Sequence, residues 1–302
     1  MGLHNLRGMQ THPLGPFDVA RIGFGAMQLP GPGVFGPPKD RDQALAVLHR
    51  AVALGVNHID TSQYYGPDVA NELIHEALHP YPADLALVSK VGARRDASGG
   101  WLPFDRPDEL RRGIEDNLRA LDIDRLAAVN LRIMPPGEAP DEIATLDPQT
   151  FGPQLDAMIT ARDEGLISGI GLSNIGVEHL SFALERTEIA CVQNAFNLLD
   201  RSAQPVLDLC FEHGIAFVPF FPLGSGFNPQ NPVLNNEIVT QAATDLGRSP
   251  AQIVLAWTLS VSPHVLLIPG TSSVSHLEQN LAIAEIELPA EVKSRLDSIP
   301  QR

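Results

Sequence analysis

The sequence has few of the residues that would indicate a secreted, metal-binding or membrane protein. Its two cysteines, Cys191 and Cys210, have a spacing that fits neither a metal site nor a disulfide framework, so we expect a reducing compartment. No run of about 18 or more apolar residues is present, and the N-terminal segment lacks the apolar core of a secretory signal. We therefore expect a soluble, cytoplasmic protein with no membrane partner.

Positive charge is also scarce. The chain has 21 Lys and Arg against 36 Asp and Glu, and its formal net charge of −15 is spread along the sequence rather than gathered in blocks. An acidic surface disfavours nucleic acid and anionic membranes, but it leaves small substrates open because a local pocket can still be basic. With 302 residues, 44% of them hydrophobic, and no shift to a linker-like composition, the chain can form one large core. We expect a single domain over residues 1–302.

Strand-like and helix-like segments alternate about eight times along the chain, with proline or glycine at most junctions. Repeated βα units with short apolar strands imply a parallel sheet covered by helices, and about eight units in this length favour an α/β fold of the (β/α)8 TIM barrel type. The strand-like segments are residues 21–25, 57–60, 85–90, 126–131, 169–173, 190–194, 215–220 and 265–268. The helix-like segments are residues 41–54, 108–121, 155–164, 177–186, 202–213, 250–259 and 275–284. Residues 30–38 and 227–233 are interpreted as surface loops.

Two of the expected strands end in ionisable residues. The segment HIDTSQYYG places Asp60 at the end of one strand and Tyr65 in the loop that follows, and the segment LVSK ends at Lys90. In a parallel α/β barrel these strand ends face one side, where reacting groups gather. Only three tyrosines exist in the chain, and Tyr64 and Tyr65 are both in this loop. A lysine ammonium would lower the pKa of the phenol, and the aspartate would keep the lysine charged, so Tyr65 is a candidate proton donor.

Six segments in order resemble the aldo-keto reductases. They are GFGAM, GVNHIDTSQYYG, LVSKVG, GIGLSN, VQNAFNLLDR and IPGTSSVSHLEQN, and the likeness extends from about Arg21 to Ala284. The resemblance implies a (β/α)8 barrel that transfers hydride from NADPH to a small carbonyl substrate. It also implies a catalytic tetrad of Asp, Tyr, Lys and His, in which Asp60, Tyr65 and Lys90 match the first three members.

The fourth member of the tetrad departs from the family pattern. Counting from Asp124, Arg132 stands at the family's histidine position, and Asn130 lies two residues earlier on the same face of the strand. A guanidinium can stabilise a developing alkoxide but cannot release a proton near neutral pH. Arg132 is therefore expected to polarise the carbonyl, with Asn130 as a second candidate donor. Two alternatives remain open: Arg132 turns aside to pair with a carboxylate, or Asn130 is only a buried hydrogen-bonding residue. The variant resembles a bacterial branch of the family that includes pyridoxal reductases.

The resemblance also implies a set of residues around the nicotinamide half of the cofactor. The carboxamide would be held by amide and hydroxyl side chains, those of Ser173, Asn174 and Gln193, and the aromatic face of Phe220 would stack on the ring. The loop after Phe220 would follow the pyrophosphate with Leu223, Gly224 and Ser225. The first loop would line the pocket near the ribose with Gly25, Met27 and Gln28.

The segment after the last strand is expected to bind the 2′-phosphate and the adenine. Backbone amides and hydroxyls at a helix N-terminus form an anion site, although simple N-capping is the other interpretation of the serines. Gly270 and His276 stand where some family members carry Lys and Arg, which weakens the preference for NADP over NAD. NADPH is favoured and NADH is possible. The residues implied are Gly270, Thr271, Ser272, Ser273 and His276 for the phosphate, with Gln279 and Asn280 for the adenine.

Two other functions were weighed against a reductase. Some barrels of this family bind NADPH and act as regulatory subunits, which would retain the cofactor residues with little turnover. A metal-dependent hydrolase finds no support, since His75 and His79 lack a carboxylate at a useful place in the sequence, so no metal site is expected. Trp101 and Phe104, in the loop after Lys90, are the expected aromatic walls of the substrate pocket, and the alternative that Trp101 packs only on the barrel rim remains open. The sequence leaves the substrate, the direction of reaction and the oligomeric state open.

Overall fold

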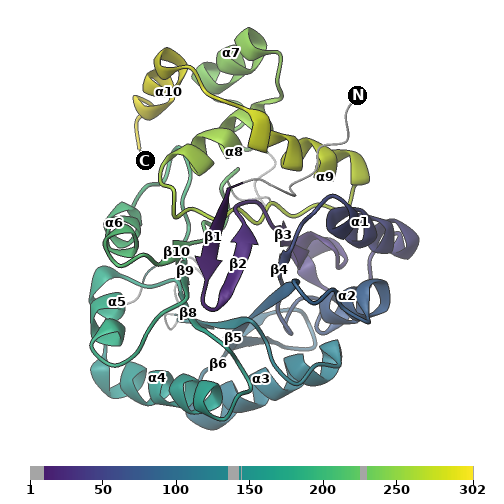
Figure 1. Ribbon diagram of the computed structural model, residues 1–302, viewed down its shortest axis with the longest axis vertical. Helices are drawn as coiled ribbons and strands as arrows, with labels where there is room; N and C mark the ends of the chain where they lie inside the picture. The colour runs from purple at the N-terminus through teal and green to yellow at the C-terminus, as the bar shows by residue number, and fades with distance from the viewer. Residues whose placement is uncertain (1–9, 135–142, 144, 225–229, 302) are drawn as a thin grey trace.

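The computed structural model describes residues 10–134, 143, 145–224 and 230–301, and they form the expected barrel. Seven parallel strands pair in the order β10-β9-β8-β7-β5-β4-β3. They are β3 (Phe24–Gly25), β4 (His58–Asp60), β5 (Ala86–Arg95), β7 (Ala128–Arg132), β8 (Ile170–Ser173), β9 (Cys191–Gln193) and β10 (Ala216–Phe217). Helices surround this sheet (Figure 1).

The sheet closes through the segment that was expected to be the last strand. Val265 bridges Phe217 of β10 and Leu267 bridges Ile22 beside β3, both in parallel. The backbone confirms the closure, because the Leu266 amide donates to the Phe217 carbonyl at 2.9 Å and the Gly23 amide donates to the Leu267 carbonyl at 2.7 Å. This segment therefore completes the eight-stranded barrel of the (β/α)8 fold.

The helices that follow the strands are those of a (β/α)8 barrel, with additions. Around the barrel lie α1 (Arg41–Ala53), α2 (Val69–Leu78), α3 (Pro107–Leu121), α4 (Pro148–Asp163), α5 (Val177–Leu184), α6 (Gln204–Glu212), α8 (Pro250–Ser260) and α9 (Val274–Leu281). Two further helices, α7 (Glu237–Leu246) and α10 (Ala290–Asp297), lie outside α8 (Figure 1). The sequence analysis did not predict α2, α7 or α10. No helix among the described residues is long and apolar enough to cross a bilayer.

Local sequence explains where the barrel helices begin. At α8, the Ser249 hydroxyl accepts from the Gln252 amide and the Gln252 side chain accepts in return from the Ser249 amide. This capping box, with Pro250 in the first turn, satisfies backbone donors that the helix itself leaves unpaired. At α1, the Asp40 carboxylate accepts from the Gln43 amide in the same way.

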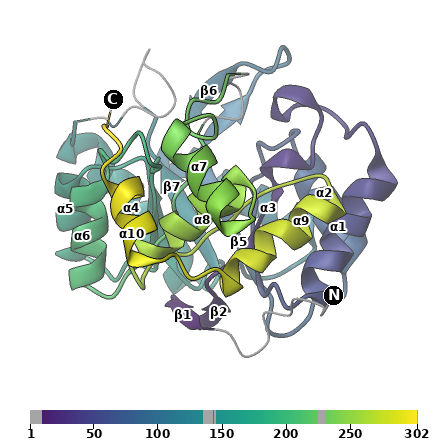
Figure 2. The same ribbon diagram turned by 90° about the horizontal axis from the view of Figure 1, so that it is seen from above.

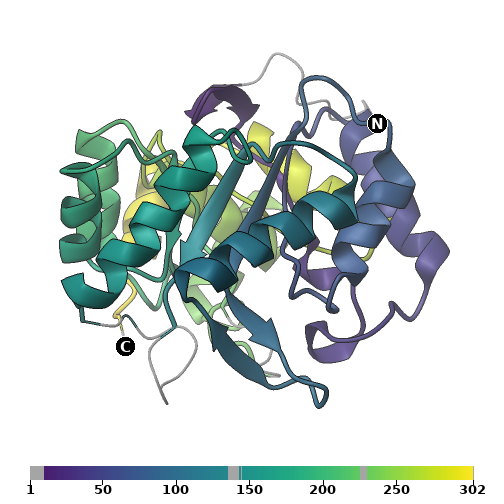
Figure 3. The same cartoon turned by 90° about the horizontal axis from the view of Figure 1, so that it is seen from below.

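A hairpin that the sequence analysis did not predict closes one end of the barrel. It consists of β1 (Thr11–Leu14) and β2 (Phe17–Ala20), paired antiparallel. Leu14 and Val19 are buried against the interior side chains of the strands. Figure 1 looks along the barrel with this hairpin in front of its centre. A second hairpin, β5 with β6 (Trp101–Phe104), extends from the opposite end (Figures 2 and 3).

The second hairpin corrects the expectation for Trp101 and Phe104, which were assigned to a loop that walls the pocket. Trp101 lies on β6 opposite Arg95, whose guanidinium carbon is 4.2 Å from the centre of its ring. Its other face meets Tyr64 edge-on, with ring centres 5.2 Å apart. Phe104 lies between the guanidinium groups of Arg94 and Arg112. Both rings therefore pack on arginines at the rim of the barrel.

His58 is a buried polar side chain inside the barrel. It is 1% exposed and neither of its ring nitrogens has a partner with good hydrogen-bond geometry among the described residues, although the Ala20 backbone partly offsets the effect of burial on its pKa. Its ring fills the space beside Gly23, where an added Cβ would lie 2.2 Å from the imidazole. Burial lowers the pKa of His58 from 6.5 to about 4.

This histidine should make the protein less stable in mild acid. Between pH 6.5 and pH 4 the unfolded chain binds a proton at this ring and the folded chain does not, so stability falls as the pH falls through that window. The loss amounts to about 3 kcal/mol over the whole window. Urea unfolding at several pH values should show a shallower acid dependence for His58→Gln than for the unsubstituted protein. The same change at the exposed His213 serves as the control, and equal slopes for both variants would contradict the assignment.

Candidate active site

The carboxyl ends of neighbouring strands place the expected site residues side by side. Strand pairing sets Gly25 opposite Asp60 and Lys90 opposite Asn130. Farther along the sheet, Ser173 of β8 lies opposite both Arg132 and Gln193. These registers gather the residues at the barrel end opposite the β1–β2 hairpin, where sites of this fold are formed.

The centre of the site is a buried ion pair between Lys90 and Asp60. The lysine is 6% exposed and the aspartate 3%. Lys90 Nζ donates to Asp60 Oδ1 and, at 3.1 Å, to the Thr61 carbonyl. The second carboxylate oxygen, Oδ2, accepts from Gln193 Nε2 at 2.6 Å. Removing two charges from water costs free energy, and the additional hydrogen bonds to Lys90 and Asp60 offset part of that cost.

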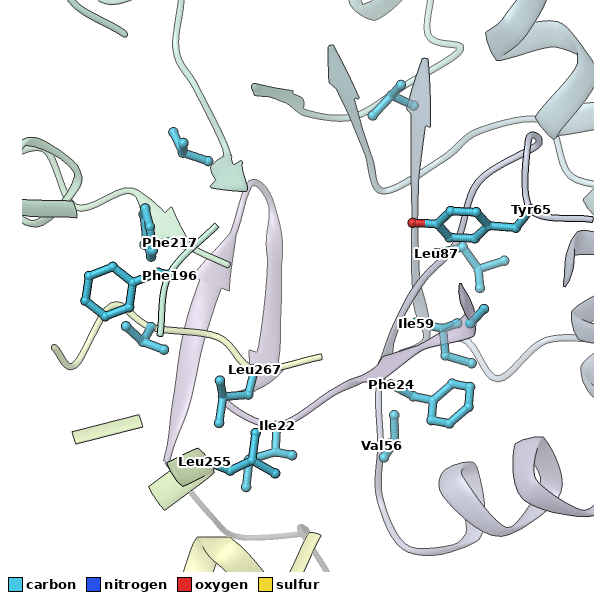
Figure 4. Packing of buried hydrophobic residues seen from close by; sticks show 14 of the residues in the cluster. Ile22, Phe24, Val56, Ile59, Tyr65, Leu87, Phe196, Phe217, Leu255 and Leu267 are labelled. Atoms are coloured by element: carbon cyan, nitrogen blue, oxygen red, sulfur yellow. The ribbon is translucent and has the colours of Figure 1, made fainter. Parts of the chain in front are cut away.

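Tyr65 lies against this pair. Lys90 Nζ is 5.1 Å from the centre of the Tyr65 ring, and the ring packs among buried side chains near Leu87 (Figure 4). Its neighbour Tyr64 meets it edge-on at 5.4 Å. The structure therefore brings together Asp60 and Lys90, which the sequence placed at strand ends, and Tyr65, which it placed in the loop after Asp60.

The electrostatics of Tyr65 differ from the sequence expectation. Burial raises the pKa of Tyr65 far above its usual value, and the Asp60 carboxylate raises it further. The cation that lowers this pKa is Arg132, whereas Lys90 was expected to lower it. Such a phenol keeps its proton at neutral pH and remains able to donate it.

Arg132 extends toward the site from the end of β7. Its Nη1 donates to Ser173 Oγ at 3.2 Å, and its guanidinium carbon is 5.1 Å from the centre of the Phe220 ring. Together with its effect on the pKa of Tyr65, these contacts place the guanidinium among the site residues. A carbonyl group between Tyr65 and Phe220 would lie within the field of a permanent positive charge.

The contacts of Asn130 do not match those expected of a catalytic donor. Its side chain is fully buried, where Nδ2 donates to the Ser89 carbonyl at 3.4 Å and Oδ1 accepts from the Cys191 thiol at 3.4 Å. An added Cβ at Gly171 would lie 2.2 Å from Oδ1, so the amide fills the space beside a glycine. Both ends of the amide are bonded inside the barrel, which favours the alternative of a buried hydrogen-bonding residue.

A pocket of about 240 Å³ opens above the ion pair and contains several expected cofactor residues. Gln193 Oε1 is buried and makes no hydrogen bond among the described residues, which leaves an acceptor for the N–H of a carboxamide. The Phe220 ring offers a flat apolar wall. The expected residues that line this pocket are Gly25, Met27, Gln28, Asp60, Tyr65, Lys90, Gln193, Phe220, Leu223, Gly224 and Gly270.

Ser173 and Asn174 lie beside this pocket in the gap between β8 and β7. Ser173 Oγ accepts from Arg132, and Asn174 Nδ2 donates to the Ile133 carbonyl at 3.0 Å. Asn174 has a left-handed backbone, with φ of 61°, a conformation that asparagine tolerates better than most residues. Ser225 lies outside the described residues.

In the expected phosphate segment the structure shows the N-capping that was the other interpretation of its serines. Ser273 caps α9, since its hydroxyl accepts from the His276 amide at 3.4 Å, and buried Thr271 accepts from the Ser273 amide at 3.0 Å. Ser272 and the His276 side chain are exposed and available to an anion. Farther along α9, Asn280 is buried and Gln279 is exposed.

Gly270 is a glycine for a steric reason. An added Cβ there would lie 2.4 Å from the Gly25 carbonyl oxygen, so the two backbone segments pass too closely for a side chain. The family's cation cannot stand at this position without moving the first loop.

Sequence reasoning missed a cation near this segment. Lys39 and Ser272 line a second pocket of about 350 Å³, which also includes Met27, Gln28 and Gln43. The one signal in the sequence is that Lys39 immediately precedes the capping Asp40 at the start of α1. Its proximity to Ser272, far along the chain, depends on barrel closure and could not be seen in the sequence.

With this geometry established, similarity to known proteins identifies the family. A sequence model described as "Aldo/keto reductase family" matches residues 21–301. The chain belongs to the aldo/keto reductase family. The pyridoxine 4-dehydrogenase of Escherichia coli (strain K12) is 48% identical to this reductase over 290 residues, which cover 96% of this chain and 98% of the relative. An uncharacterized oxidoreductase of Schizosaccharomyces pombe is 38% identical and covers 95% of this chain and 89% of its own length.

Solved structures agree with this family assignment. A thermostable aldo-keto reductase in complex with the inhibitor epalrestat has a TM-score of 0.78 at 28% identity, covering 96% of this reductase and all (100%) of that chain. An aldo/keto reductase from Klebsiella pneumoniae, solved in complex with NADP and acetate, has a TM-score of 0.77 at 26% identity, covering 97% and 96%.

Removing the charge of Asp60 should destabilise this reductase strongly. In Asp60→Asn the buried Lys90 ammonium loses its counter-ion, which costs about 3–5 kcal/mol of folding stability. Urea unfolding of both proteins measures the difference. The control is Glu76→Gln, which breaks the exposed pair with Arg41 and should cost less than about 1 kcal/mol. Similar small losses in both variants would contradict the central role of the buried pair.

Proposed function

We propose that this protein is an NADPH-dependent oxidoreductase that reduces aldehydes to alcohols, with pyridoxal as the favoured substrate. The observation that carries the proposal is a protonated phenol, Tyr65, beside the buried Lys90–Asp60 pair in a pocket that also presents a buried amide oxygen and an aromatic wall. Membership of the aldo/keto reductase family supports the reaction class. The similarity to the E. coli pyridoxine 4-dehydrogenase supports the substrate class.

In this proposal each site residue has a separate role in carbonyl reduction. Bound NADPH supplies the hydride from C4 of its nicotinamide ring. Phe220 would hold the face of that ring, and Gln193 Oε1 would accept from its carboxamide. Tyr65 would donate a proton to the substrate oxygen as hydride reaches the carbon. Lys90, held by Asp60, would keep the site polar where negative charge develops on that oxygen.

Arg132 supports pyridoxal in particular. Pyridoxal carries a phenolic oxygen beside its aldehyde, so two oxygens with negative character lie next to each other. The guanidinium fork donates two parallel hydrogen bonds to such a pair of oxygens, which an imidazole cannot do. In this proposal Arg132 binds both oxygens, polarises the aldehyde and leaves the proton transfer to Tyr65.

Lys39 supports NADPH over NADH in the same proposal. It lines the pocket that includes Ser272, so its ammonium can reach a 2′-phosphate held at the start of α9. It would thereby replace the cation that cannot stand at Gly270.

The proposal extends to the organisation and place of the protein. The family model matches residues 21–301, and Ile22, near the start of that range, pairs with Leu267, near its end. We therefore propose that residues 1–302 form a single domain. We also propose that it works in the cytoplasm, where NADPH is available and where the two free thiols, Cys191 and Cys210, would stay reduced.

Tyr65→Phe tests the proton donor. The variant should lower kcat for pyridoxal reduction by about 10²–10⁴-fold, because the ring remains but the proton is lost. Tyr64→Phe is the matched control, since it removes the neighbouring hydroxyl and should retain most activity. The measurement is steady-state NADPH oxidation, with NADPH binding followed by fluorescence. Near-normal turnover by Tyr65→Phe would refute this role, and NADPH binding without turnover by the unsubstituted protein would favour a regulatory subunit instead.

Arg132→His tests the recognition of adjacent oxygens. Its kcat/KM should fall at least about tenfold more for pyridoxal than for pyridine-4-carboxaldehyde, which lacks the neighbouring hydroxyl, since one charge-assisted bond is lost only with pyridoxal. Equal losses with both aldehydes would mean that Arg132 polarises the carbonyl alone.

Lys39→Ala tests the cofactor preference. Loss of an exposed cation beside a phosphate should raise the Kd for NADPH about three- to tenfold and leave the Kd for NADH unchanged. Lys293→Ala, which removes a lysine on α10, is the control, and calorimetric titration measures both cofactors. Equal effects on NADPH and NADH would show that Lys39 does not contact the 2′-phosphate.

A further inference from the structure

Two histidines and an aspartate lie close together on the surface. They are at the carboxyl end of α2, whereas Tyr65 lies before its amino end. His75 and His79 lie in the last turn of α2 and just after it, and their rings stack with centres 4.9 Å apart. Asp122, the residue that ends α3, lies opposite them. Its Oδ2 is 3.9 Å from His75 Nε2 and 3.8 Å from His79 Nε2. The sequence expectation that these histidines lack a carboxylate is therefore wrong.

The three side chains offer the donors that a divalent transition-metal ion prefers. Two imidazole nitrogens and one carboxylate oxygen lie within 4.8 Å of one another. In a tetrahedral zinc site with bonds of about 2.0–2.2 Å, neighbouring donor atoms are about 3.4 Å apart. The observed separations of 3.8 and 3.9 Å exceed this by about 0.5 Å. Small rotations of exposed side chains can close that difference.

The backbone holds these donors in place. The spacing of four residues puts both histidines on one face of α2, and the His79 amide donates to the His75 carbonyl at 3.0 Å. Asp122 has a left-handed backbone, with φ of 52°, that turns the chain at the end of α3. Tyr81 ties the two helix ends together, because its hydroxyl donates to the Leu121 carbonyl at 2.7 Å.

The surroundings also favour a cation. The carboxyl end of α2 carries the negative end of its helix dipole. The nearby Arg119 donates to Asp116 at 2.7 Å and so has its own carboxylate partner. The side chains are about 40% exposed for each histidine and 74% for Asp122, so a metal ion can reach them and keep water in the remaining position.

We propose that His75, His79 and Asp122 bind one divalent transition-metal ion of the zinc class, separate from the active site. Imidazole with a single carboxylate suits zinc, cobalt and nickel better than calcium or magnesium, which prefer oxygen donors. The bound ion would join α2 to α3 and so stabilise the folded chain without taking part in the reaction.

Zinc titration of the full chain, purified without a histidine tag, tests the proposal. Calorimetry should show one equivalent of Zn²⁺ bound and a rise in the melting temperature with added Zn²⁺, because the metal binds the folded state. His79→Ala and Asp122→Asn should each weaken Zn²⁺ binding at least about tenfold and abolish most of the thermal shift. His213→Ala, at an exposed histidine of α6, should bind Zn²⁺ as the unsubstituted protein does.

Cobalt absorption provides a second measurement that does not depend on stability. Co²⁺ at this site should give a visible absorption band that disappears in His75→Ala and persists in His213→Ala. Zinc binding that survives in both His79→Ala and Asp122→Asn would overturn the proposal. A loss of Zn²⁺ binding in the His213→Ala control equal to the loss in those two variants would also overturn it.

Discussion

The ion pair between Lys90 and Asp60 is the interaction on which the rest of the site depends. Two charges removed from water must be fully bonded, and here the lysine takes a carboxylate and the Thr61 carbonyl while the carboxylate also takes the Gln193 amide. These bonds join β4, β5 and β9 at one end of the barrel. They also use the Gln193 Nε2 group, so its Oε1 atom is the end of the amide that makes no hydrogen bond among the described residues.

Arg132 changes the electrostatics of this arrangement relative to the family's histidine. The Arg132 guanidinium is the cation whose field lowers the pKa of Tyr65. An arginine keeps its charge at any physiological pH. In the proposed reaction, the permanent charge and the group that gives up a proton therefore belong to different residues.

Much of the fold could be predicted from the sequence, because barrel strands and helices have strong hydrophobic periodicities and are separated by glycine and proline. The closing segment at residues 265–268 and the strand end at Asp60 were predicted from this pattern, whereas the strand expected to end at Lys90 continues to Arg95. The β1–β2 hairpin and the extension of β5 into β6 were not predicted, since short exposed strands carry little periodicity. Their residues alternate between buried and exposed over only four positions.

Contacts between distant residues were the harder part of the site to predict. The sequence placed Asn130 on the face of Arg132, but whether its amide reached a ligand depended on Cys191 and on the space at Gly171. Lys39 near Ser272, and Asp122 beside His75, depend in the same way on how the helices close around the barrel. Such pairs follow from packing, which one sequence without its fold does not show.

The β1–β2 hairpin has a consequence for the order of events at the site. Leu14 and Val19 pack on the side chains that fill the barrel interior, so a molecule that reaches Tyr65 enters from the end opposite the hairpin. Two ligands that enter by the same opening cannot exchange independently when one lies beneath the other. In the proposed arrangement, with the nicotinamide against Gln193 and Phe220, the cofactor would therefore bind before the aldehyde and leave after the alcohol.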